Sequence, residues 1–270
     1  MLIYRLLPWL TVAAGLISGY LRTIEMSHGF TAEGFSIPGN GWHVAALVIT
    51  IIIALVSMFF SFFMLMPESR RSAMILTKTD PITSVLYYAA ALVMLVGGII
   101  NIVGAIIVFN IGWLVAGILL LLSVASIVAL GISLRKAAFP KALATVAILP
   151  IFWACVHLIL HFQKDTQNPV IAEYMYAVLA MVFFVLLLHS ETGILFQRHS
   201  AKRLYFNALM CTYCNIVYAM EIISGFITGR FASLSDRYGN YVSLLIAGAA
   251  ILLSGYCFRC LLRKKVPELD

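Results

Sequence analysis

The residues best suited to chemistry lie in an apolar stretch between Leu204 and Ile227. Polar and small side chains recur there in steps of three and four, which places them in one stripe on a helix: Asn207, Cys211, Cys214, Tyr218, Glu221 and Gly225. A carboxylate inside a membrane span is costly and marks a functional site by default. Glu221 is therefore the predicted centre of function, and Asn207 and Tyr218 are predicted to bind substrate or protons with it.

A second candidate is a pair of histidines on another apolar stretch. His157 and His161 lie four residues apart and so share one helical face. A rise of about 1.5 Å per residue places both near the depth of Glu221. If the two helices are neighbours, a histidine and Glu221 can share a proton, as in proton relays and ion-coupled transporters. In the alternative interpretation, Glu221 only locks two helices together and the histidines reach toward the membrane interface.

The composition indicates that a membrane positions these residues. Of 270 residues, 63% are hydrophobic and 11% are charged, whereas a globular protein is about half apolar and a quarter charged. The apolar runs are about 20 residues long, which matches the hydrocarbon layer. Lys and Arg at the ends of these runs account for the net charge of +7, so they predict contact with lipid headgroups and not with nucleic acid.

The expected architecture is a single all-α domain, a polytopic integral membrane protein with eight transmembrane helices. Their expected bounds are about 3–21, 43–66, 83–107, 112–134, 142–162, 171–190, 204–227 and 239–262. Gly15 and Gly19 predict that the first helix makes a close contact with another helix. This first helix is expected to be retained and not cleaved as a signal peptide. Pro150 predicts a kink in the fifth. The segment 22–41 is expected to be a solvated connector or a lid.

The distribution of basic residues predicts the topology. With eight crossings, 14 of the 18 Lys and Arg residues fall on the side of the termini, and four fall on the other side: Arg22, Lys164, Arg230 and Arg237. Because positive charge is retained in the cytoplasm, both termini are expected to be cytoplasmic. The expected location is the cell membrane.

Other chemistry is less well supported by the residues. All five cysteines lie inside apolar runs, so disulfides are not expected. The pairs Cys211/Cys214 and Cys257/Cys260 have the spacing of zinc ligands, but each lies within a helix, which favours buried thiols over a metal site. No metalloprotease, serine-hydrolase or nucleotide-binding signature occurs. No catalytic residue, metal or cofactor is therefore assigned, and an enzyme is not the favoured class.

Three functions remain open. The first is a permease or permease-like subunit that uses Glu221 in a polar cavity for substrate or proton coupling, with a small molecule or ion as substrate. The second is a membrane anchor or electron-transfer subunit that binds a quinone or haem near His157 and His161, with His43 as a further haem ligand. The third is a non-catalytic interaction or sensor protein. A partner subunit is compatible with each of them.

Overall fold

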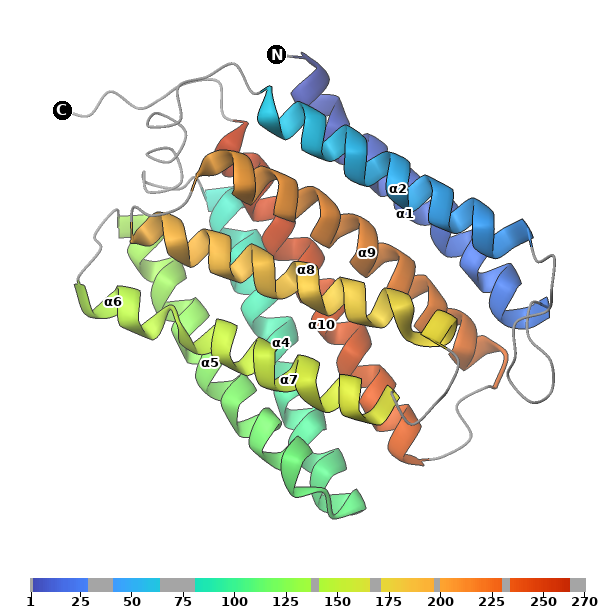
Figure 1. Cartoon of the computed structure of the whole chain (residues 1–270). Coiled ribbons are helices and arrows are strands. Elements are labelled where there is room, and N and C mark those ends of the chain that lie inside the picture. Colours follow the sequence, from blue (N-terminus) through green and yellow to red (C-terminus); the bar gives the residue numbers. More distant parts are fainter. Residues whose placement is uncertain are drawn as a thin grey trace.

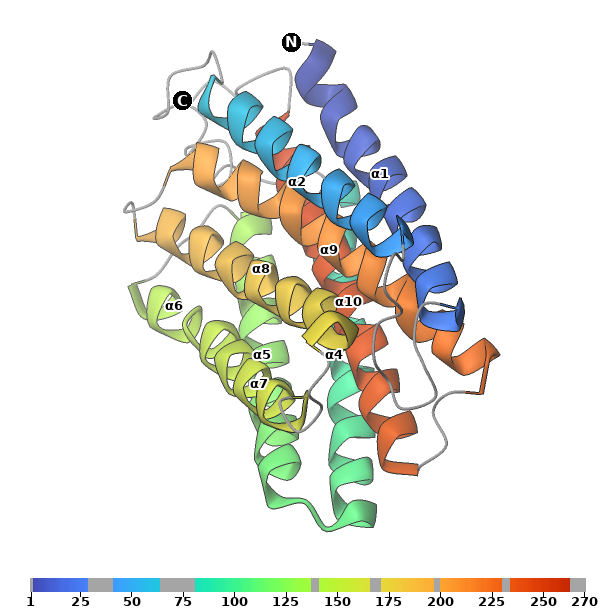
Figure 2. The ribbon, with the colours of Figure 1, turned by 45° about the vertical axis from the view of Figure 1, so that its right-hand side comes forward.

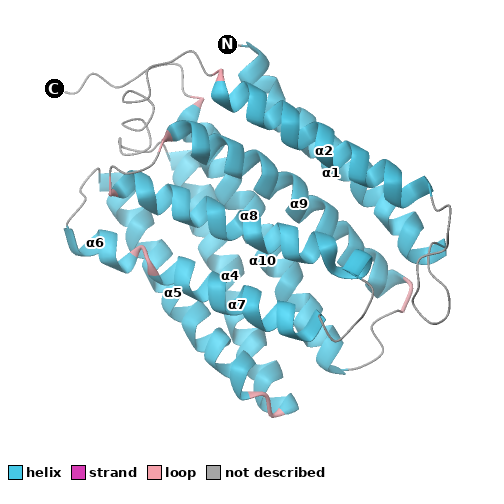
Figure 3. Cartoon of the chain, in the orientation of Figure 1, coloured by secondary structure: helices cyan, strands magenta, loops and turns pink. Residues whose placement is uncertain are grey.

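The computed structural model describes residues 2–28, 41–63, 81–136, 141–165, 171–196, 200–229 and 234–262. These residues are helical apart from short turns (Figure 3). The helices are α1 (Leu2–His28), α2 (Gly41–Phe62), α4 (Pro81–Val108), α5 (Ile111–Lys136), α6 (Lys141–Val146), α7 (Leu149–Asp165), α8 (Ile171–Leu195), α9 (Ala201–Ile227) and α10 (Leu234–Leu261). Six of them, α2, α4, α5, α8, α9 and α10, are long and apolar enough to cross a membrane. The expected all-helical, membrane-type architecture is confirmed at this level.

The helices form two packing units, a ring and a hairpin. In the ring, α4, α5, α7, α8, α9 and α10 each pack against the next, and α10 returns to α4. The hairpin consists of α1 and α2, which pack against each other and against the outer side of α9 (Figures 1 and 2). Helix α9 therefore has neighbours on both sides, and every residue from Asn207 to Tyr218 is buried. This explains how a helix with so many polar residues is accommodated.

Helix α1 and helix α9 approach closely through glycine. A Cβ atom on Gly15 would lie 3.2 Å from Cβ of Ile216, and one on Gly19 would lie 2.8 Å from Cβ of Met220. The close contact predicted from the glycine spacing is therefore confirmed. Because the contacts advance in the same direction along both helices, α1 and α9 run parallel. This brings the next turns of the two helices, which carry Arg22 and Glu221, close to each other.

Helix α1 is longer than expected. It continues to His28, so residues 22–28 of the expected connector are helical. Arg22 and Glu25 form an i,i+3 ion pair there, and the Thr23 hydroxyl donates a hydrogen bond to the Gly19 carbonyl at 2.9 Å. The expectation that residues 22–28 form a solvated connector is wrong, because the charges of Arg22 and Glu25 compensate each other within the fold. Most of the segment expected to be a connector or a lid, residues 29–40, falls outside the described residues, so the lid stays a prediction.

The kink predicted at Pro150 is a complete break between α6 and α7. Proline has no N–H, so the carbonyl of Val146, four residues earlier, loses its helical partner. The Ser126 hydroxyl of α5 donates to that carbonyl at 2.6 Å, and the Thr192 hydroxyl of α8 donates to the Ala147 carbonyl at 3.2 Å. Neighbouring helices thus satisfy the backbone groups that hydrocarbon cannot.

The start of α1 and the end of α10 lie at the same end of the bundle, here called the terminal end. Arg5 Nη2 donates to the Leu262 carbonyl at 3.3 Å. The Tyr4 hydroxyl donates to the carbonyl of Phe63, just after α2, at 2.9 Å. The Tyr205 hydroxyl of α9 donates at 2.8 Å to the Tyr4 carbonyl, which Pro8 has deprived of its helical partner. Arg22 and Glu221 therefore lie near the opposite end.

Candidate functional site

Four ionisable side chains form a connected network where the hairpin meets α9. Arg22 is at its centre: Nη1 lies 2.8 Å from Oε2 of Glu25, and Nε donates to Oε2 of Glu221 at 3.5 Å. The second oxygen of Glu25, Oε1, lies 2.9 Å from Nδ1 of His43. These residues come from α1, α2 and α9. Arg22, Glu25, His43 and Glu221 are called the charge network below.

Burial in the charge network is graded toward the end of the bundle. The side chains of Arg22 and Glu25 are 0% and 1% exposed, that of Glu221 is 12% exposed, and that of His43 is 28% exposed. With a neutral His43, one guanidinium and two carboxylates sum to a charge of −1. One added proton brings the sum to zero. Because buried charge is costly unless it is compensated, the position of Arg22 between two acids lowers the cost of burying them.

A chain of hydroxyl groups continues from the charge network toward the middle of the bundle. The ring of Tyr176 on α8 lies under Arg22, with 5.8 Å between Cζ and the ring centroid, a cation–π geometry. The hydroxyls of Tyr176 and Tyr213 each lie 2.8 Å from Oγ1 of Thr50. The Tyr213 hydroxyl also donates to Oγ of Ser18 at 2.7 Å. The polar region thus joins the hairpin to both α8 and α9.

The predicted stripe on α9 separates into parts with different partners. Glu221 faces Arg22, and Tyr218 is buried one turn before it, in a cluster that also contains Tyr176. Asn207 lies 14 residues from Glu221, about 21 Å along the helix. Its Nδ2 donates to Oγ of Ser190 on α8 at 2.6 Å. The structure therefore brings Tyr218 and Glu221 together and places Asn207 in a helix contact near the terminal end.

The two predicted histidines lie in another part of the ring. They are on α7, which packs against α5 and α8, and α8 lies between α7 and α9 in both views (Figures 1 and 2). The condition under which a histidine could share a proton with Glu221, that α7 and α9 are neighbours, is therefore not met among the described residues. His161 Nε2 lies 3.1 Å from Oγ of Ser243 on α10. His43 is on α2 in the hairpin, outside the ring. It is therefore separated from His157 and His161 on α7 and is not placed to ligate the same haem.

The α7 histidines pack in an aromatic cluster with two tryptophans. The Trp113 centroid lies 5.4 Å from that of His157 and 5.2 Å from that of His161, and Trp153 lies 5.5 Å from His157. His157 is 1% exposed. Neither of its ring nitrogens has a hydrogen-bond partner among the described residues. Trp113, Trp153, His157 and His161 are called the aromatic cluster below.

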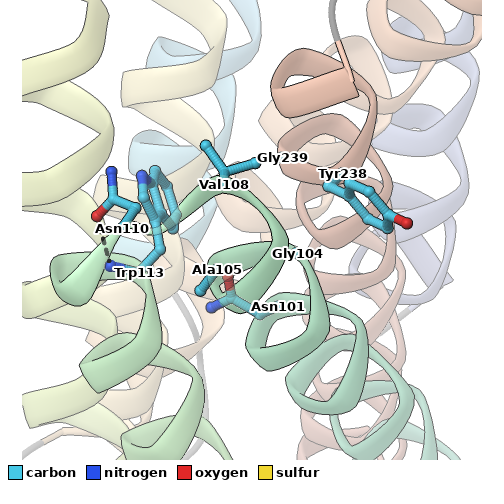
Figure 4. Close-up of a pocket in the computed structure, with 8 residues that line it drawn as sticks. All are labelled: Asn101, Gly104, Ala105, Val108, Asn110, Trp113, Tyr238 and Gly239. Carbon is cyan, nitrogen blue, oxygen red and sulfur yellow. Dashed lines mark hydrogen bonds between the residues drawn. The ribbon is translucent and has the colours of Figure 1, made fainter.

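A small cavity opens beside the aromatic cluster, between α4, α5 and α10 (Figure 4). Its volume is about 50 Å³, and it is lined by Asn101, Gly104, Ala105, Val108, Asn110, Trp113, Tyr238 and Gly239. Oδ1 of Asn110 accepts a hydrogen bond from the Trp113 backbone N–H at 3.1 Å. Asn101 Nδ2 is buried and has no partner among the described residues. Room for about one or two water molecules exists here, at the water volume of about 30 Å³.

Arg22 and Glu25 are the members of the charge network that the sequence analysis did not predict as site residues. A signal was present: Gly15, Gly19, Arg22 and Glu25 follow one another at spacings of three and four, which places the two charges on the same helical face as the glycines. Their charge alone suggested a loop. Among the described residues, no group of three or more His, Cys, Asp or Glu side chains is placed to hold a metal ion.

No protein-family model, curated protein or solved structure matches the chain. The fold and the site define its class by themselves: a helical protein with six helices suited to crossing a membrane and a buried charge network between a hairpin and a ring.

Proposed function

We propose that the chain is a multi-pass transport protein of the cell membrane, a permease or permease subunit, in which the charge network binds and releases a proton coupled to movement of a small molecule or ion. One observation carries the proposal: the buried carboxylate of Glu25 and the partly buried one of Glu221 share the guanidinium of Arg22, and His43, the partner of Glu25, is more exposed near the end of the bundle. Intramembrane charges of this kind mark ion and proton pathways.

The proposal includes eight crossings with cytoplasmic termini. Helix α1 and the α6–α7 pair are the two crossings beyond the six apolar helices. The charges of Arg22 and Glu25 lower the hydropathy of α1, and the break before Pro150 shortens α7. The contact between Arg5 and the Leu262 carbonyl supports termini on one side. The excess of basic residues on that side supports the cytoplasm, so the charge network lies in the outer half.

A coupling mechanism follows from the order of the contacts. A proton that arrives at His43 can pass to Glu25 across 2.9 Å, which leaves Arg22 paired with Glu221 alone. A proton on Glu221 instead removes the ion pair that joins α1 to α9. The contact between the hairpin and the ring therefore weakens when Glu221 is protonated. Such a contact is a two-state element that a proton can bias.

The test uses the full chain in liposomes that contain a pH-sensitive dye. A potassium diffusion potential drives protons inward, and a small-molecule extract of cells supplies cotransported solutes. We expect acidification well above that of protein-free liposomes, and at least a tenfold loss in Glu221→Gln and Glu25→Gln. His43→Gln should slow uptake, and His28→Gln, an exposed histidine on the last turn of α1, is its matched control. Acidification equal to that of protein-free liposomes contradicts the proposal.

The aromatic cluster favours a second candidate, a membrane anchor or electron-transfer subunit. The buried imidazole of His157 has no hydrogen-bond partner within the described part of the chain and lies beside two indole rings. It suits a ligand with hydrogen-bonding groups and an aromatic ring, such as a quinone. This candidate predicts that lipid extracts of the purified protein contain quinone in stoichiometric amount, and that His157→Leu removes it. A colourless, quinone-free protein that passes the proton assay excludes it in favour of transport.

A further inference from the structure

We propose that Glu191 is a second proton-binding site. It lies inside the ring near the terminal end, whereas the charge network lies near the opposite end. Helix α8 continues past its expected end at Ser190 and carries Glu191 into the bundle. The residue is 7% exposed. It lies 15 residues from Tyr176 on the same helix, about 22 Å along the axis. Tyr176 contacts Arg22, so the two acids are far apart.

The surroundings of Glu191 are polar but contain no cation among its described contacts. The Tyr87 hydroxyl of α4 donates a hydrogen bond to the Glu191 carboxyl group. The ring of Tyr256 on α10 lies 4.7 Å from that of Tyr87, and its hydroxyl is buried without a partner among the described residues. Cys257 of α10 is the third titratable group that faces the acid. Glu191 takes part in none of the ion pairs formed by the described residues.

The two buried acids therefore have opposite environments. Glu221 has Arg22 beside it, which stabilises a carboxylate. Glu191 has one hydroxyl donor and no cation among its described contacts, and an uncompensated charge there would cost several kcal/mol. Glu191 therefore holds its proton as a neutral carboxyl group, whereas the neighbouring guanidinium of Arg22 favours the ionised form of Glu221. Protein sites that use two acids for different tasks are built on this contrast.

Two polar groups on α9 lie at intervals between the two regions. Two residues after Tyr213 on α9, Asn215 Nδ2 donates to the carbonyl of Ala180 at 3.3 Å and to that of Cys211 at 2.8 Å. Farther toward the terminal end, Asn207 binds Ser190, the residue before Glu191. An acid near each end of the bundle can bind a proton on its own side, and the polar groups of α9 lie in the interval that a relay between the two acids has to cross. This relay role rests on the proposed function, whereas the neutral state of Glu191 does not.

Infrared difference spectroscopy of the purified full chain tests the protonation state directly. The spectrum of the wild type minus Glu191→Gln should contain the carbonyl band of a protonated carboxyl group at neutral pH. The matched spectrum of the wild type minus Glu221→Gln should contain carboxylate bands instead. Tyr87→Phe, which keeps Glu191, should shift the carbonyl band because the hydrogen bond is lost. Carboxylate bands in the Glu191→Gln difference overturn the proposal.

The liposome assay then tests the relay role separately. If the wild type carries protons, Glu191→Gln should reduce the rate at least tenfold while the melting temperature shows that it is folded. An unchanged rate in that variant overturns the relay role and leaves the proposed function standing. If the wild type carries no protons, the proposed function and the relay both fall, and the infrared result still decides whether Glu191 binds a proton.

Discussion

Replacement of Arg22 by methionine tests whether charge holds the hairpin to the ring. Methionine keeps a long apolar side chain in the space of the arginine stem and removes the guanidinium. Glu25 and Glu221, whose side chains are 1% and 12% exposed, then lose the cation that they share. The two acids are left buried with like charge, which desolvation and mutual repulsion both disfavour.

The expected loss of stability is large. Removing one partner of a buried ion pair costs about 3–5 kcal/mol. At about 2–4 °C per kcal/mol, the scale for domains of 150–250 residues, the melting temperature should fall by about 6–20 °C. Protonation of the stranded acids offsets part of this cost. The deficit relative to the wild type should therefore shrink as the pH falls and grow as the pH rises.

A thiol-reactive fluorescent maleimide measures the melting temperature. Cys211, Cys214 and Cys257 are fully buried, so they react when the bundle opens. Arg203→Met is the matched control because Arg203 is exposed, and a surface substitution changes stability by about 0.5 kcal/mol or less.

A rescue variant separates charge from packing. When Glu25→Gln and Glu221→Gln are added to Arg22→Met, no charge remains in the centre of the network, and most of the lost stability should return, because buried ion pairs can be replaced by neutral groups at little cost. Two results would contradict charge compensation as the force that holds the helices together. One is a melting temperature of Arg22→Met equal to that of the control Arg203→Met, and the other is a triple variant that is as unstable as Arg22→Met alone.

Three further predictions use the same melting assay. Gly19→Ala should lower the free energy of unfolding by about 1–3 kcal/mol, because the added methyl group overpacks against α9. Gly248→Ala, whose Cβ would meet no atom closer than 4.0 Å, should raise it by up to about 1 kcal/mol through helix propensity. Equal effects of the two substitutions contradict the close contact between α1 and α9. Ser126→Ala should cost about 1–3 kcal/mol because the Val146 carbonyl is left buried without its donor. Tyr205→Phe should cost a similar amount through its bond to α1, and a wild-type melting temperature in either variant refutes the role of that hydroxyl.

Local sequence patterns predicted the helices themselves better than they predicted which helices pack against each other. Gly15 and Gly19 indicated a close contact, and Pro150 indicated a kink, which the structure shows as a break, because both features depend on the backbone of one segment. The end of α1 was misjudged because Arg22 and Glu25 have charges typical of a loop. The pairing of Arg22 with Glu25 is local, but their contacts with Glu221 and His43 join three helices, which no local pattern contains.

The sequence by itself determined that this chain has long apolar helices and that Glu221 is an acid within one of them. The tertiary structure alone decided that Glu221 faces Arg22 and that α8 separates it from His157. The physical reason is that helical periodicity defines which residues share a face but not which helix covers that face. Within lipid, apolar faces are nearly equivalent, so partners are selected by close packing and by compensation of buried charge.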